Sequence, residues 1–352
     1  MDNRRNLNPD VWMLHLYDST LRRLSFDAHS AGDFEQWRLQ FLETLSDSMG
    51  GMPQFDMPLE PLITETVGED GYSRHRLLLQ TEPLMNVPCW LLVPDDISEE
   101  ERRPAILALH GHGLGRDQVA GVGLDDPELA QRIRTANYDY GRQFARRGYV
   151  VLVPDHRGFG ERSGNRDRLG NRDYCNLLMI KQALLGRNPL MSNIYDVCRC
   201  VDYLQNRPDV DAERIGAVGL SYGGTMALFT TALEPRIKVA CVSCYMNSFR
   251  KYALEMDNFC GNQTPSDLLT FAEMWDVAIS IAPRPLLLES GMRDSGFPIE
   301  QARMANEKVR AAYVSLGHGD RIAIDEFDGG HEFSGRLTFD WFGKWLEHES
   351  SR

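Results

Sequence analysis

No apolar run in this 352-residue sequence approaches the roughly 20 residues that a membrane-spanning helix needs. Positive charge is also scarce, because 38 Lys and Arg stand against 51 Asp and Glu, a formal net charge of −13. Such a chain offers no basic surface that could neutralise phosphates, so we expect no nucleic-acid partner and no membrane partner. The polar residues 1–9 contain no apolar segment of a signal peptide. We therefore expect a cytoplasmic protein.

Cysteine is sparse and odd in number, with seven residues spread through apolar segments. A disulfide framework is thereby excluded as the organising feature. Two close pairs, Cys198 with Cys200 and Cys241 with Cys244, do not form the doubled C-x2-C ribbon of a structural zinc site. We interpret them as buried thiols.

What the sequence does contain is the composition of a folded globular protein, 42% hydrophobic and 25% charged. After an antiparallel pair at 72–80 and 87–93, short runs rich in Val, Ile and Leu alternate with helical stretches. This pattern predicts an α/β fold with a mostly parallel central sheet and helices on both faces. The expected strands of that sheet are 105–109, 149–153, 215–220, 239–242, 286–288 and 322–327, and the expected helices are 138–147, 191–206, 222–233, 299–315 and 337–349.

The first seventy residues differ from the rest. Apolar residues recur there at about helical spacing, and a segment punctuated by Pro and Gly follows them. We predict a helical N-terminal extension over 1–70, ahead of a catalytic domain over 71–352 with excursions at 114–137, 158–190 and 245–281. The extension is expected to cap a pocket or to pair with a second subunit, which would make a homo-oligomer.

A G-x-S-x-G pentapeptide stands at residues 219–223, directly after an expected strand and directly before an expected helix. A serine in so sharp a turn has a strained backbone, and the glycines let neighbouring segments approach it without a Cβ clash. The strand–turn–helix context makes Ser221 the candidate nucleophile. An ordinary helix-capping serine would leave the glycines unexplained.

A serine hydroxyl needs a base to accept its proton. His331 follows the last expected strand in a Gly-rich loop and is preferred to His318, which lies before that strand and so at the opposite end of the sheet. The orienting carboxylate is expected at Asp294, in the turn after the strand 286–288, with Glu289 and Asp328 as alternatives. Each member of this predicted triad follows a strand.

Attack on a carbonyl also requires backbone donors for the developing oxyanion. The strand 105–109 runs into His110-Gly-His112-Gly113, and we assign one donor to the amide of His112, with Gly113 as a near substitute. The amide of Tyr222, directly after the nucleophile, is the other candidate donor. His110 and His112 could instead bind a metal ion, but the sequence places no third ligand beside them.

Nucleotide-binding loops are not supported by the glycine pattern. Gly111, Gly113 and Gly115 are followed by Arg116 rather than by the third glycine of a dinucleotide fingerprint, and no G-K-S or G-K-T occurs. We expect no metal ion and no organic cofactor.

Four segments together resemble the α/β-hydrolase superfamily, and more narrowly its dienelactone hydrolase and acetyl xylan esterase-like branch: 153–162, 211–224, 282–288 and 330–333. The resemblance covers about residues 72–349 and implies a serine hydrolase that acts on a carboxylic ester without a cofactor. The smallest dienelactone hydrolases carry a cysteine at the position of Ser221. Asp155, Arg157 and Arg162 are interpreted as structural anchors, with a substrate-carboxylate contact as the alternative for an arginine.

The predicted function is therefore hydrolysis of a small-molecule ester through an acyl-enzyme intermediate. Cleavage of a C–C or amide bond by the same triad is the first alternative, and a non-catalytic binding protein on a hydrolase fold is the second. Apolar residues of the 245–281 excursion are candidates for a pocket wall, although core packing would explain them equally well. They are Met246, Phe249, Tyr252, Phe259 and Trp275.

Overall fold

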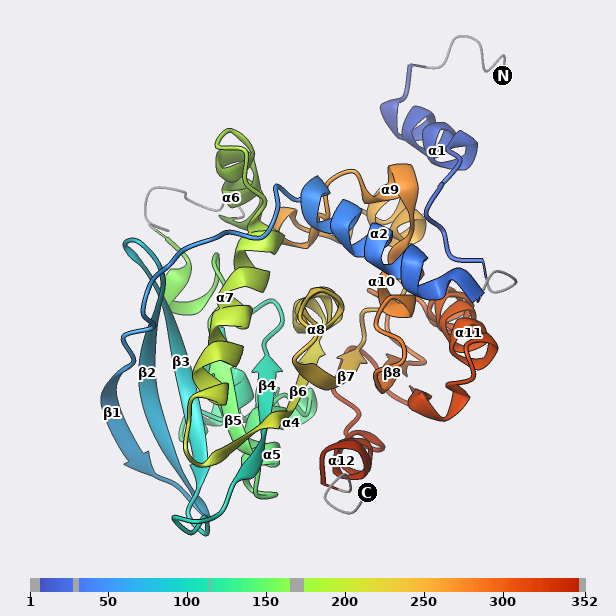
Figure 1. Ribbon diagram of the computed structural model, residues 1–352. Helices are drawn as coiled ribbons and strands as arrows, with labels where there is room; N and C mark the ends of the chain where they lie inside the picture. The colour runs from blue at the N-terminus through green and yellow to red at the C-terminus, as the bar shows by residue number, and fades with distance from the viewer. Residues whose placement is uncertain (1–6, 28–31, 114, 165–173, 348–352) are drawn as a thin grey trace.

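The computed structural model describes residues 7–27, 32–113, 115–164 and 174–347. A single nine-stranded sheet runs through the molecule in the order β1-β2-β3-β5-β4-β6-β7-β8-β9 (Figure 1). The six strands β4 to β9 are parallel to their neighbours among themselves. β1, β2 and β3 form an antiparallel edge, and β3 pairs antiparallel with β5. The strands are β1 (Leu62–Gly68), β2 (Tyr72–Glu82), β3 (Met85–Pro94), β4 (Arg103–Leu109), β5 (Val150–Pro154), β6 (Val210–Leu220), β7 (Ile237–Ser243), β8 (Leu286–Gly291) and β9 (Ile322–Phe327).

Two hydrophobic clusters cover the two faces of this sheet, because alternate side chains of a buried strand point to opposite sides. In β4, Ala105, Leu107 and Leu109 belong to one cluster, and Ile106 and Ala108 belong to the other. The larger cluster is completed by α2 (Phe34–Ser48), α7 (Pro189–Gln205), α8 (Tyr222–Leu233), α10 (Met274–Ile279) and α11 (Ile299–Ser315). The smaller one is completed by α3 (Arg116–Ala120), α5 (Tyr140–Ala145), α12 (Thr338–Phe342) and the π-helical turn η8 (Gly343–Glu347).

The expected fold class is confirmed, since a mostly parallel sheet carries helices on both faces. Eight of the nine strands coincide with predicted strands, and α8 and α11 have the predicted bounds. The helical interpretation of residues 1–70 was wrong at β1, an edge strand whose residues are almost all exposed. A strand without a buried face leaves no alternation of apolar and polar residues to detect.

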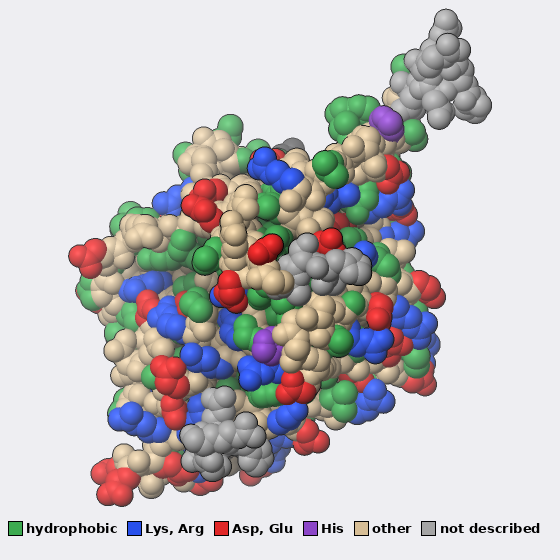
Figure 2. Space-filling model, turned by 45° about the vertical axis from the view of Figure 1, so that its right-hand side comes forward, with side chains coloured by type: hydrophobic (Ala, Val, Ile, Leu, Met, Phe, Trp, Pro, Cys, Tyr) green, Lys and Arg blue, Asp and Glu red, His purple; other side chains and the backbone are tan. Residues whose placement is uncertain are grey.

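The N-terminal segment contains two different helices. α2 buries Phe34, Phe41 and Leu45 in the larger cluster, as an amphipathic helix should. α1 (Pro9–Ser19) has no buried residue and stands out from the body of the protein (Figures 1 and 2). Within the described ranges, no helix has the length and apolarity that crossing a bilayer would require.

The three excursions carry the remaining helices. The first holds α3 and α4 (Pro127–Thr135), although Leu114 itself lies outside the described residues. The second holds η3 (Gly160–Arg162) and α6 (Tyr174–Ala183), with 165–173 outside the described residues. The third holds η5 (Arg250–Glu255), η6 (Gly261–Gln263), α9 (Leu268–Phe271) and α10, while η7 (Gly319–Arg321) precedes β9.

Candidate active site

Ser221 lies in the turn between β6 and α8, with backbone angles φ 63° and ψ −120°. A positive φ is unfavourable for a residue with a side chain, so the surrounding contacts must hold this turn in place. Its amide donates to the carbonyl of Ser243 at 3.0 Å. The motif glycines permit the packing, because a Cβ on Gly223 would overlap the carbonyl of Leu109 in β4, and a Cβ on Gly219 would overlap the carbonyl of Gly223. The serine is thereby presented, partly exposed, at the end of the sheet.

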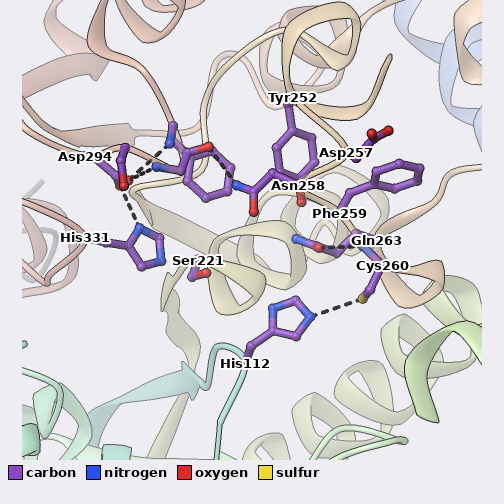
Figure 3. Close-up of a pocket in the computed structure, with 13 residues that line it drawn as sticks. His112, Ser221, Tyr252, Asp257, Asn258, Phe259, Cys260, Gln263, Asp294 and His331 are labelled. Carbon is purple, nitrogen blue, oxygen red and sulfur yellow. Dashed lines mark hydrogen bonds and ion pairs between the residues drawn. The ribbon is translucent and has the colours of Figure 1, made fainter. Parts of the chain in front are cut away.

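His331 and Asp294 form a close pair at the same end of the sheet. Nδ1 of His331 lies 2.6 Å from Oδ2 of Asp294, and the carboxylate is buried whereas 41% of the imidazole side chain is exposed. The other carboxylate oxygen accepts the amides of Gly296 and Phe297 at 2.8 and 3.1 Å. Because a carboxylate is an acceptor only, Nδ1 carries the proton of the neutral imidazole and Nε2 is left to accept one. Figure 3 shows the ring lying between Asp294 and Ser221.

The alternatives for the third member have other partners. Glu289 is fully buried in β8, where it accepts a hydrogen bond from the Thr338 hydroxyl, and burial raises its pKa to about 7. Asp328 is exposed and pairs with Arg293. His318 precedes β9, at the end of the sheet away from Ser221. Of the acids weighed from the sequence, Asp294 is the one in contact with His331.

A ring stacks on the imidazole from the side of the pocket. Phe297 lies parallel to His331, with centroids 5.5 Å apart and planes at 9°. Because its own amide binds Asp294, this residue contacts both members of the pair. Phe297 was not among the residues predicted for the site, because nothing in the sequence distinguishes it from a core aromatic residue.

The H-G-x-G loop after β4 contains two histidines with different surroundings. His110 is fully buried, its Nδ1–H donates to the carbonyl of Gly111 at 2.8 Å, and its Nε2 accepts the amide of His156 at 3.0 Å. Burial lowers the pKa of His110, which keeps it neutral. His112 instead reaches the pocket, where Nε2 lies 3.2 Å from Sγ of Cys260. Both nitrogens of His110 are therefore occupied, and the two histidines do not face a common metal position.

Two features of the backbone bear on the predicted oxyanion donors, the amides of His112 and Tyr222. The amide of Gly111 donates to the Tyr138 hydroxyl at 2.7 Å, which holds the loop in place ahead of His112. Tyr222 is the first residue of α8, so its amide belongs to the first turn, whose amides have no carbonyl partner within the helix. Its ring is buried against Phe159, with centroids 4.9 Å apart.

The pocket beside Ser221 has a volume of about 480 Å³ and opens to solvent. Of the five predicted wall residues, Tyr252 and Phe259 line it. The structure does not bring the other three there: Met246 and Phe249 are buried in the core, and Trp275 packs against the core beneath the ammonium of Lys308. Helical and loop turns in this excursion rotate neighbouring side chains to opposite sides, which composition alone cannot resolve. The remaining lining residues are His112, Asp257, Asn258, Cys260, Gln263, Asp294, Ser295, Gly296, Phe297 and His331.

The loop after β5 is held by buried ion pairs. Asp155 accepts the amide of Arg116 at 2.8 Å and its guanidinium at 2.6 Å. Arg157 donates to Asp196 at 2.7 Å and to Glu82 at 2.6 Å. Arg162 pairs with Asp196 as well, at 2.8 Å. Asp155, Arg157 and Arg162 thus all have charged partners inside the protein, which agrees with their interpretation as structural anchors.

Comparisons with known proteins find similarity to several hydrolases, acetyl xylan esterases among them. The sequence model of the acetyl xylan esterase family (AXE1) matches residues 133–276. YtaP, a candidate hydrolase of Bacillus subtilis, is 29% identical over 263 residues, which cover 72% of this chain and 81% of YtaP. The crystal structure of a candidate acetyl xylan esterase from Bacteroides fragilis superposes with a TM-score of 0.78 at 20% identity, over 93% of this chain and 84% of that one. Acetyl xylan esterase 1 from Thermoanaerobacterium superposes with a TM-score of 0.59 at 17% identity, over 94% and 96%.

Proposed function

We propose that the chain is a carboxylic ester hydrolase that works through a triad of Ser221, His331 and Asp294, and its fold and its similarity to the acetyl xylan esterases support this proposal. The observation that carries this proposal is the 2.6 Å contact between His331 Nδ1 and Asp294 Oδ2 in the pocket that also contains Ser221. The contact sets the tautomer that leaves Nε2 free to accept a proton.

In the first half of the reaction, Oγ of Ser221 attacks the ester carbonyl carbon and its proton passes to Nε2 of His331. The buried carboxylate of Asp294 stabilises the imidazolium that results. When the tetrahedral intermediate collapses, the bond to the alcohol oxygen breaks and that oxygen takes the proton from Nε2. The alcohol leaves, and the acyl group remains on Ser221.

In the second half, a water molecule attacks the acyl carbon and gives a proton to Nε2 of His331. Collapse of the second tetrahedral intermediate breaks the bond to Oγ, which takes the proton back from Nε2. The carboxylic acid is released and Ser221 is regenerated. No cofactor takes part in either half of this scheme.

The amides of Tyr222 and His112 are the proposed oxyanion donors. The position of Tyr222 at the first turn of α8 supports the first, and the position of His112 in the pocket, one residue after the anchored Gly111 amide, supports the second. In serine hydrolases, removal of one preorganised oxyanion donor raises the activation free energy by roughly 3–4 kcal/mol.

The lining of the pocket favours a short acyl group on an alcohol that bears several polar groups. Asp257, Asn258, Gln263 and Ser295 offer hydrogen-bonding side chains, while Phe259 and Tyr252 supply apolar surface. Such a mixture suits a hydroxyl-rich alcohol, for example an acetylated sugar, and the match to the acetyl xylan esterase family supports the same substrate class.

The direct test compares Ser221→Ala with Ser295→Ala in hydrolysis of 4-nitrophenyl acetate. Both variants remove one hydroxyl from the same pocket, but only the first removes the proposed nucleophile. We expect kcat of Ser221→Ala to fall by at least about 10⁴-fold and that of Ser295→Ala to stay within about threefold. Retained turnover by a folded Ser221→Ala protein would refute the role of Ser221 as the nucleophile. Faster turnover of the matching anilide or of a β-diketone would favour the amide or C–C alternative.

A further inference from the structure

Three potential metal ligands from separate segments meet beside the pocket, which His112 and Cys260 line. His112 comes from the loop after β4, Cys175 from the first turn of α6, and Cys260 from the residue before η6. Their ligand atoms all lie within 4.8 Å of one another, and His112 Nε2 is 3.2 Å from Cys260 Sγ (Figure 3). Both cysteines are buried, whereas His112 is exposed to the pocket. The sequence places no third ligand near His112, because both cysteines lie far along the chain.

This set of donors matches the preference of one class of metal ion. One imidazole nitrogen and two thiolates form the borderline-soft donor set that Zn²⁺ selects. At Zn–S and Zn–N distances of about 2.3 and 2.0 Å, tetrahedral ligand atoms lie roughly 3.5–3.8 Å apart. The observed separations therefore need only small side-chain movements to enclose an ion.

The one other grouping of ligand atoms in the described part of the chain does not compete. Cys244 also lies near Asp294 and His331, but a metal ion there would have to break their 2.6 Å contact, so that group belongs to the site already described. No disulfide links any of the seven cysteines, so Cys175 and Cys260 both carry thiols.

We propose that His112, Cys175 and Cys260 form an inhibitory Zn²⁺ site beside the substrate pocket. Three protein ligands leave the fourth position of a tetrahedral ion open. Because His112 and Cys260 both line the pocket, the ion would lie beside the substrate. A bound ion would occupy space that the substrate needs and would fix the loop whose His112 amide is a proposed oxyanion donor. The binding site stands on geometry alone, whereas its inhibitory effect rests on the proposed function.

Binding must displace protons from the thiols. Cys175 and Cys260 would bind the ion as thiolates, so each thiol must lose its proton when the ion binds. Each thiol that loses its proton to the metal makes the apparent affinity rise by up to about tenfold per pH unit. The site should therefore bind more tightly as the pH increases from about 6 to 8.

The experiment uses Co²⁺ as a spectroscopic substitute for Zn²⁺ on the full-length protein, after treatment with EDTA and a reductant. We expect one equivalent of Co²⁺ to give a thiolate-to-cobalt charge-transfer band that Zn²⁺ abolishes. Cys175→Ser should lose most of that band, whereas Cys198→Ser, which removes a thiol outside the cluster, should keep it. An absent band in the parent protein, or an equal band in Cys175→Ser, would overturn the site.

A second arm measures ester hydrolysis with Zn²⁺ and then with EDTA. Among the described residues that line the pocket, Cys175 is absent, so Cys175→Ser should keep its basal activity. The Zn²⁺ concentration that inhibits this variant should be at least about tenfold higher than for the parent protein. Cobalt binding without any esterase activity would refute the proposed function and leave the site standing. Cobalt binding without inhibition by Zn²⁺ would overturn the inhibitory role.

Discussion

Replacement of Asp294 by Asn changes one atom of the proposed triad and little else. Asn keeps a carbonyl oxygen that can accept the amides of Gly296 and Phe297, so the loop after β8 should remain in place. The group that faces His331 becomes an amide donor. To hydrogen-bond with it, the imidazole must move its proton to Nε2, where it can no longer accept the proton of Ser221.

The size of the effect follows from the buried position of the carboxylate. Asp294 is only 5% exposed, so its attraction to the imidazolium is weakly screened by salt. A pair of unit charges about 4 Å apart, at an effective dielectric constant of about 20, interacts by about 4 kcal/mol. That energy corresponds to about 10³-fold in rate, and the wrong tautomer adds to it. We expect kcat to fall by about 10³- to 10⁴-fold, with a change in unfolding free energy below about 1 kcal/mol.

The assay is steady-state hydrolysis of 4-nitrophenyl acetate, with chemical denaturation to measure stability. Asp257→Asn is the matched control, because Asp257 lines the same pocket but does not contact His331 in the described structure. Its kcat should stay within about threefold of the parent value. A folded Asp294→Asn protein with more than about a tenth of the parent activity would refute the role of this carboxylate.

Three further predictions concern stability and assembly. Burial raises the pKa of Glu289 to about 7, so the stability that its neutral form contributes is present at low pH and is lost as the pH rises through 7. The unfolding free energy of the parent protein should therefore fall between about pH 5.5 and 8.5, and Glu289→Gln should remove about 2 kcal/mol of that fall. An unchanged pH profile in the variant would contradict this. Burial alone would raise the pKa of Asp196, but Arg162 and Arg157 lower it to about 2. Asp196→Asn should therefore lower the unfolding free energy at pH 7 by roughly 3–5 kcal/mol, measured by denaturant titration. A loss below about 1 kcal/mol would show that the two arginines do not need this carboxylate as a partner. Trp12 is 56% exposed on α1, so we expect the chain to self-associate there. Trp12→Glu should then lower the molar mass measured by light scattering. A monomeric parent protein would refute this interface.

The sequence predicted the centre of the sheet better than its edge. β4, β5, β7 and β8 are buried along almost their whole length, and their apolar runs are visible without any structure. β1 escaped notice because it is exposed along nearly its whole length. The outward position of α1 was equally hidden, because its apolar residues look like those of a helix that buries one face.

In the site, the residues that follow strands were accessible to sequence reasoning. Ser221, Asp294 and His331 each follow a strand, and the carboxyl ends of parallel strands meet at one edge. Residues of the 245–281 excursion were not accessible in this way, because side-chain direction there depends on irregular turns. The nearness of Cys175 to Cys260 also depends on how α6 packs against η6, a contact between distant segments that no local pattern encodes.

The central claim is that Ser221 is the nucleophile of an ester hydrolase. Reaction of the full-length protein with a fluorophosphonate, followed by mass spectrometry of its peptides, tests this claim most directly. The account predicts one adduct, on Ser221, with concurrent loss of hydrolysis and no adduct in Asp294→Asn over the same time. An adduct on any other serine accompanied by loss of activity, or full inactivation without modification of Ser221, would contradict it.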